Sequence, residues 1–66
     1  MSARRFHEAA TQIERDYGDV MNVIVRHGAG DGGLIVMEDA EQVCVMRYGA
    51  DGLLLAVDPP VFKGGA

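Results

Sequence analysis

A single helix-length amphipathic stretch followed by four short apolar runs fills almost the whole of this 66-residue chain. The stretch is residues 3–17, and glycine or acidic residues separate the later runs, which are 20–27, 34–39, 43–48 and 53–58. Connections this short leave no room for the long insertions that commonly carry an active site. We therefore expect one small domain over residues 1–66 that ends in a flexible tail at 59–66.

Residues 3–17 have the periodicity of an amphipathic helix. Apolar residues recur three or four positions apart along one stripe, which consists of Phe6, Ala9, Ala10, Ile13 and Tyr17. Ser2 can cap the start of the helix by accepting a backbone N–H, and Gly18 is a common type of residue just after a helix end. The sequence therefore predicts one helix at the beginning of the domain.

The four later runs are rich in valine, isoleucine and leucine and are too short for ordinary helices, so we interpret them as strands. Their short connections favour antiparallel neighbours, and Asp51 with Gly52 is a typical hairpin turn. The expected fold is α+β, with one N-terminal helix packed on a four-stranded antiparallel β-meander. A continuous helix over residues 34–47 is the alternative, which the acidic interruption at Asp39 disfavours.

One helix can cover only one face of a four-stranded sheet, so the other face needs a cover of its own. The expected core joins the helix stripe to three strand residues, with Phe6, Ala10 and Ile13 against Val23, Val25 and Val45. The second face keeps Val20 and Ile24, and under one interpretation it is an interaction surface. Under the other, Val61 and Phe62 fold back from the tail and cover it.

The net charge of −4 lies entirely in the second half of the chain. Residues 1–30 carry four acidic and four basic side chains, whereas residues 31–66 carry six acidic and two basic ones. Proteins that bind nucleic acid usually show a basic patch instead, so we expect no direct binding of nucleic acid. In a meander, the ends of the second and fourth strands meet at one edge, which predicts an acidic, partner-binding edge made of Glu38, Asp39, Glu41 and Asp58, with Asp19 nearby. The alternative is that these carboxylates are ordinary solvated turn residues.

Motifs for catalysis or metal binding are weak throughout. Cys44 is the single cysteine, and His7 and His27 have no metal-ligand partners at suitable spacing. The G-x-G-x-x-G pattern at 28–33 precedes an apolar run rather than the helix that a phosphate site needs. Residues 64–66, Gly-Gly-Ala, resemble the terminal diglycine of ubiquitin-like carriers, but those folds place a hairpin before the helix. We expect no enzyme, cofactor or metal.

The function that this pattern predicts is a small acidic inhibitor that binds a protein. In its sharpest form it mimics nucleic acid and blocks the basic site of a nucleic-acid-binding protein, and in size and charge alone the chain is similar to phage anti-CRISPR and toxin-neutralising immunity proteins. The alternative is a structural or regulatory homodimer that associates through the uncovered sheet face. No apolar run is long enough to span a bilayer, and a lone cysteine fits a reducing compartment. We therefore expect the cytoplasm of a bacterium or a phage-infected host cell.

Overall fold

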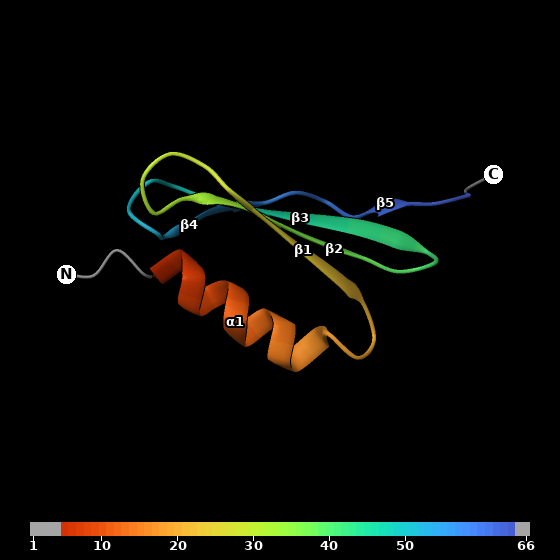
Figure 1. The fold of residues 1–66 in the computed structure, drawn as a ribbon. Coiled ribbons are helices and arrows are strands. Elements are labelled where there is room, and N and C mark those ends of the chain that lie inside the picture. The colour runs from red at the N-terminus through yellow and green to blue at the C-terminus, as the bar shows by residue number, and fades with distance from the viewer. Residues whose placement is uncertain (1–4, 65–66) are drawn as a thin grey trace.

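The computed structural model describes residues 5–64 as one helix followed by an antiparallel sheet (Figure 1). The elements are α1 (Arg5–Tyr17), β1 (Asn22–His27), β2 (Gly33–Glu38), β3 (Gln42–Tyr48), β4 (Leu54–Val57) and β5 (Val61–Phe62). Strands β1 to β4 lie side by side in chain order, and each pair is antiparallel. The predicted α+β meander is therefore confirmed, and the alternative of a helix over residues 34–47 is wrong.

A carboxylate from a distant loop caps the start of α1. The Oδ2 atom of Asp31 accepts the backbone N–H of Arg5 at 2.9 Å and lies 3.5 Å from that of Phe6. The backbone N–H of Asp31 in turn donates to the carbonyl of Ala50 at 2.9 Å, in the turn between β3 and β4. The cap expected at Ser2 lies outside the described residues. Asp31 thus ties the helix start to both hairpin loops at that end of the sheet.

Gly52 makes the approach of these three segments possible. Its φ of 82° lies in the left-handed region that favours glycine. A Cβ at this position would overlap Asp31 Oδ2 and would lie 2.5 Å from the Cβ of Arg5. The Asp-Gly turn signal is therefore required for the packing of the helix as well as for the hairpin.

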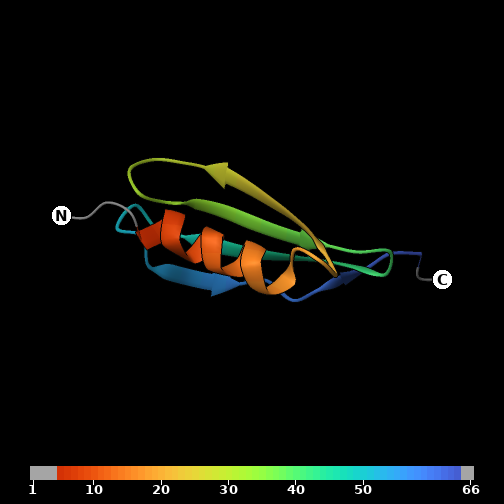
Figure 2. The ribbon, with the colours of Figure 1, turned by 60° about the horizontal axis from the view of Figure 1, so that its bottom comes forward.

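Helix α1 lies on one side of the sheet (Figure 2), and its buried residues pack against side chains of β1, β2 and β3. The buried apolar side chains are Phe6, Ala10, Ile35 and Met37, of which Phe6 and Ile35 are fully buried. Phe6 is 1% exposed, and its ring lies 5.4 Å from that of His27 and 5.2 Å from that of Tyr48, measured between centroids. Aromatic pairs at such distances add to the free energy of burial.

The register of the strands corrects one part of the expected core. Val45 pairs with Val36, and both lie on the sheet face away from α1. The residues next to Val45 in β3, Cys44 and Met46, face the helix in its place. Ile13 is half-buried rather than fully buried. Since side chains alternate along a strand, an error of one residue in the assignment of β3 exchanges its two faces.

Part of the expected tail belongs to the sheet. Strand β5 pairs with the beginning of β3, where Val61 lies opposite Val43 and Phe62 opposite Gln42. Prolines have no N–H to donate, so Pro59 and Pro60 separate β4 from β5 along the same edge of β3. The prediction of a tail from residue 59 misses this fifth strand, and residues 65 and 66 lie outside the described part.

Candidate interaction surfaces

Two of the carboxylates predicted at the acidic edge, those of Glu38 and Asp39, already have partners next to or within the turn that joins β2 to β3. Glu38 forms an ion pair with Lys63, with 2.8 Å between Oε2 and Nζ. The Oδ1 atom of Asp39 accepts the backbone N–H groups of Glu41 at 2.7 Å and Gln42 at 2.9 Å, which is the ordinary role of an aspartate in a turn. Lys63 stays close because its backbone N–H donates to the carbonyl of Glu41 at 2.7 Å.

Asp58 is also paired, and it lies farther from that turn than the sequence predicts. Its backbone N–H donates to the carbonyl of Val45, near the middle of β3, at 2.9 Å. Its carboxylate forms an ion pair with Arg47, at 3.0 Å between Oδ2 and Nη2. The hydrogen bond to Asp58, and secondly its negative charge, raise the pKa of the Arg47 guanidinium. β5 and the two prolines lie between Asp58 and the turn.

The remaining members of the predicted set, Asp19 and Glu41, have no ion pair or side-chain hydrogen bond through their carboxylates within residues 5–64. Both are exposed. The structure therefore gathers Glu38, Asp39 and Glu41 at one turn, where a lysine neutralises one charge. The ion pairs to Lys63 and Arg47 had no signal in the local sequence, because the partners lie 25 and 11 residues away.

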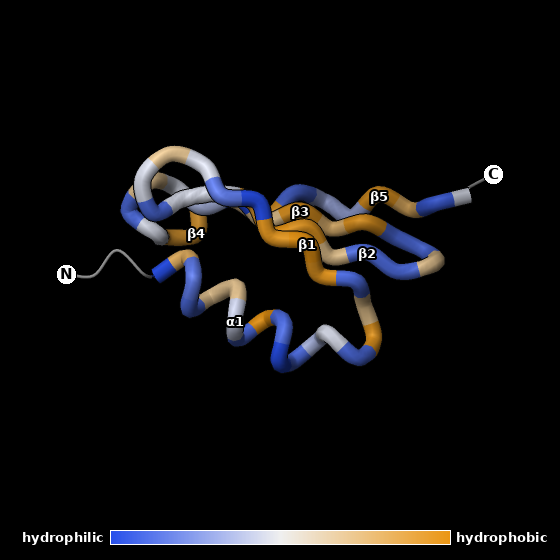
Figure 3. Tube along the Cα trace, viewed as in Figure 1, coloured by the Kyte–Doolittle hydropathy of each residue, from blue (hydrophilic) through white to orange (hydrophobic). Residues whose placement is uncertain are grey.

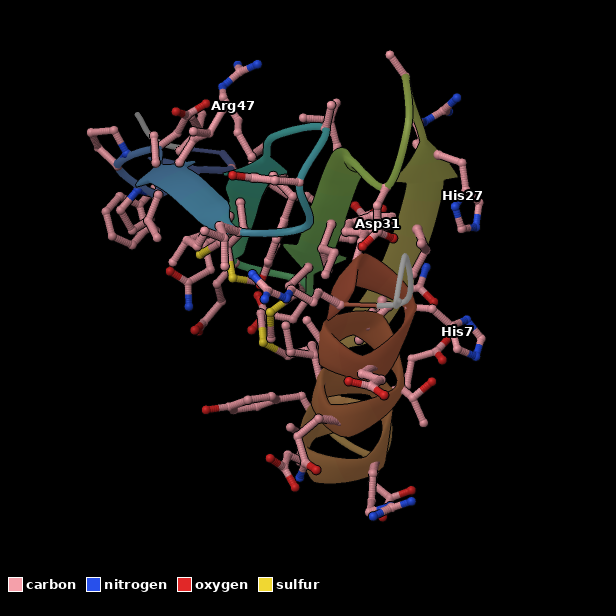
Figure 4. All side chains as sticks on the ribbon, turned by 90° about the vertical axis from the view of Figure 1, so that its left-hand side faces the viewer. His7, His27, Asp31 and Arg47 are labelled. Atoms are coloured by element: carbon pink, nitrogen blue, oxygen red, sulfur yellow. The ribbon has the colours of Figure 1, made fainter. Side chains whose placement is uncertain are left out.

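The sheet face away from α1, here called the open face, has no second layer over it among the described residues (Figure 4). Its middle is a central row of three apolar residues that are neighbours across β1, β2 and β3, namely Ile24, Val36 and Val45. All three are half-buried by their neighbours in the sheet. A sheet normally buries its apolar faces against another element, and no element formed by residues 5–64 lies over the central row.

Charged residues flank the central row unequally. On the side of the glycine-rich loop, the next row across the sheet is Arg26, Leu34, Arg47 and Ala56. On the side of the β2–β3 turn, the next row is Asn22, Glu38, Val43 and Val61. The first row, here called the basic row, carries Arg26 and Arg47, of which Arg47 is paired with Asp58. The second, here called the acidic row, carries Glu38, which is paired with Lys63 and lies next to the turn that contains Asp39 and Glu41. Figure 4 shows the Arg47 side chain on the side of the sheet opposite α1.

Val61 and Phe62 do not fold back over the open face, so that interpretation of the sequence is wrong. Val61 and Phe62 extend the edge of the sheet and remain 66% and 68% exposed. In Figure 3, hydrophobic residues, drawn in orange, occur in several strands, including β5 near the C-terminal end. The apolar surface therefore stays accessible along the sheet.

A smaller apolar area lies on the helix side, beyond the part of the sheet that α1 covers. Leu54 and Val57 of β4 lie opposite Tyr48 and Met46, which face the core. They are 50% and 59% exposed because the buried residues of α1 pack against β1, β2 and β3 rather than against β4. This area lies at the β4 edge of the sheet, where Leu53 and Leu55 are also 49% and 71% exposed.

The described residues contain no pocket and no group of three or more potential metal ligands. His7 and His27 lie on different elements, and the glycines at 28–33 form the loop that leads directly into β2. No helix within residues 5–64 is long and apolar enough to cross a membrane. Comparisons with models of known families, with curated proteins and with solved structures found no match to this chain. Function must therefore be argued from the chemistry of its surfaces.

Proposed function

We propose that this protein is a structural or regulatory homodimer whose two copies associate through the open face. The observation that carries the proposal is the central row of Ile24, Val36 and Val45, which is continuous across three strands and has no covering layer within the described part of the chain. Burial of apolar area contributes about 1 kcal/mol for every 40 Å² removed from water. A second copy supplies the missing layer in the way that two sheets pack in a β-sandwich.

The size of the open face suits a weak dimer. Strands spaced about 4.8 Å apart, with a rise of about 3.3 Å per residue, give a face of roughly 15–20 Å in each direction. Two such faces bury on the order of 450–800 Å² in total, which is below the range of stable specific interfaces and is typical of weak, transient ones. We expect a dissociation constant on the order of 1–100 μM, because an interface of this size has little surplus over the cost of association.

The acidic inhibitor of nucleic-acid-binding proteins remains the second proposal, and two observations favour it. The chain carries a net charge of −4, and the carboxylates of Glu41 and Asp19 are exposed without ion pairs in the described part. It is the weaker proposal, because the Asp39 carboxylate is taken up by backbone N–H groups of its own turn and Asp58 lies away from that turn. For both proposals the compartment is the bacterial or host cytoplasm, which the single cysteine supports.

The test is the molar mass of the protein in solution over a concentration series, measured by sedimentation equilibrium. Val36→Glu places a charge in the central row and should leave the protein monomeric. Val20→Glu is the matched control: Val20 was expected on the same face as Ile24, but it lies in the turn before β1, outside the sheet, and is 70% exposed. A monomeric wild-type protein at about 1 mM, well above the expected dissociation constant, would overturn the proposal.

Val36 lies in the middle of the sheet, so folding of the variants is checked by circular dichroism. If Val36→Glu unfolds, Val36→Thr replaces it, because threonine keeps the β-branched shape and adds one hydroxyl to the interface. Val36→Thr should weaken the dimer while Val20→Thr does not. The apolar contact should change little with salt, whereas an acidic edge on a basic partner weakens strongly as salt rises.

A further inference from the structure

We infer that the two copies pack with their strands running in opposite directions, so that Arg26 of each copy faces the acidic row of the other. This inference rests on the proposed homodimer and adds the orientation of the partner. It is carried by the charge pattern of the open face, in which the central row separates a basic row from an acidic one.

Symmetry allows two simple ways to place one open face on a second copy of itself. If the two-fold axis runs along the strands, each row faces its own equivalent, and the two basic rows lie together. If the axis runs across the strands, the central row faces itself and each basic row faces an acidic row. Like charges brought together at an interface are unfavourable, so the charge pattern selects the second arrangement.

Arg26 is the charged residue that gains an ion-pair partner in this arrangement. It is exposed and has no ion pair within residues 5–64, unlike Arg47, which is paired with Asp58. Arg26 follows Asn22 by four positions on β1, and Ile24 lies midway between them, where the axis would cross. Arg26 of one copy then lies over Asn22 of the other. In that second copy, Glu38 is the neighbour of Asn22 on β2, one strand spacing or about 5 Å away. An arginine side chain spans that distance.

Glu38 can accept such a partner. Its side chain is 30% exposed and its one ion pair in the described part is with Lys63, so carboxylate lone pairs remain free for a second donor. The nearby Glu41 adds negative charge at the same end of the face. The guanidinium of Arg26 placed there would approach the Glu38 carboxylate, whose ion-pair partner among the described residues is the exposed Lys63.

Charge reversal tests the orientation. Arg26→Glu should weaken the dimer by at least about fivefold, because each dimer loses two favourable pairs and gains two repulsive ones. Arg15→Glu is the control with the same change in net charge, since Arg15 lies in the last turn of α1, away from the open face. The double variant Arg26→Glu with Glu38→Arg should recover most of the affinity. An equal effect of Arg26→Glu and Arg15→Glu would overturn the orientation.

A cross-link gives an independent readout. In a Cys44→Ala background, Ile24→Cys should be joined between copies by a short bismaleimide cross-linker, since facing sheets lie about 10 Å apart and Ile24 lies next to its equivalent only when the axis crosses the strands. With the axis along the strands, Ile24 would face the region of β4 and would not cross-link. Suppose that Val36→Glu abolishes the dimer, but Ile24→Cys does not cross-link and Arg26→Glu does not weaken the affinity. That result would refute the orientation and leave the homodimer proposal intact. A wild-type monomer would refute both.

Discussion

Replacing Phe6 with leucine should remove a defined part of the core without emptying the site. Phe6 is 1% exposed, and its ring contacts the rings of both His27 and Tyr48. Leucine keeps most of the apolar contact with Ile35 but loses two aromatic contacts, each contributing about 0.5–1.5 kcal/mol. Together with a small cavity, we expect a loss of about 1.5–3 kcal/mol in the free energy of unfolding.

Such a loss is large for this chain, because domains of this length are stabilised by only about 3–10 kcal/mol. The midpoint of thermal unfolding should fall by about 8–20 °C, measured by circular dichroism at one fixed protein concentration. Phe62→Leu is the matched control: Phe62 is 68% exposed, so its loss should be within about 0.5 kcal/mol. Similar midpoints for the two variants would show that Phe6 is not the centre of the core.

Two further predictions concern carboxylates, and urea unfolding checks both. Asp31→Ala should cost about 0.5–2 kcal/mol because it removes the cap of α1, whereas Asp31→Asn keeps an acceptor oxygen and should cost less; equal stability of all three proteins would contradict the capping role. Asp39→Ala should cost about 1–2 kcal/mol because two backbone N–H groups lose their acceptor, while Glu41→Ala in the same turn should have little effect. A larger effect of Glu41→Ala would contradict that assignment.

The helix and the order of the strands could be predicted because their signals are local. The spacing of Phe6 and Ala10 defines the buried side of α1, and the turn residues between the apolar runs mark the hairpins. The two faces of β3 could not be told apart from the sequence. Apolar residues occupy four consecutive positions, Val43, Cys44, Val45 and Met46, so no alternation of polar and apolar residues marks the buried face. Register with Val36 places Val45 on the open face.

The candidate surfaces were predictable only in part. The sequence indicates that one sheet face lacks a cover and that acidic residues gather near the β2–β3 turn. It does not show that Lys63 returns to Glu38, or that Asp31 crosses to α1, because both contacts join residues about 25 positions apart and depend on the completed fold. The fifth strand was missed because Pro59 and Pro60 resemble the start of a tail.

The most direct test of the homodimer follows the backbone amides by NMR as the protein is diluted across the expected dissociation constant. We predict that concentration-dependent shifts gather at Ile24, Val36, Val45 and their flanking residues on the open face. The exposed side of α1, including Arg15, should show no change. Shifts confined to the helix side of β4, or a spectrum that does not change between about 10 μM and 1 mM, would contradict association through the open face.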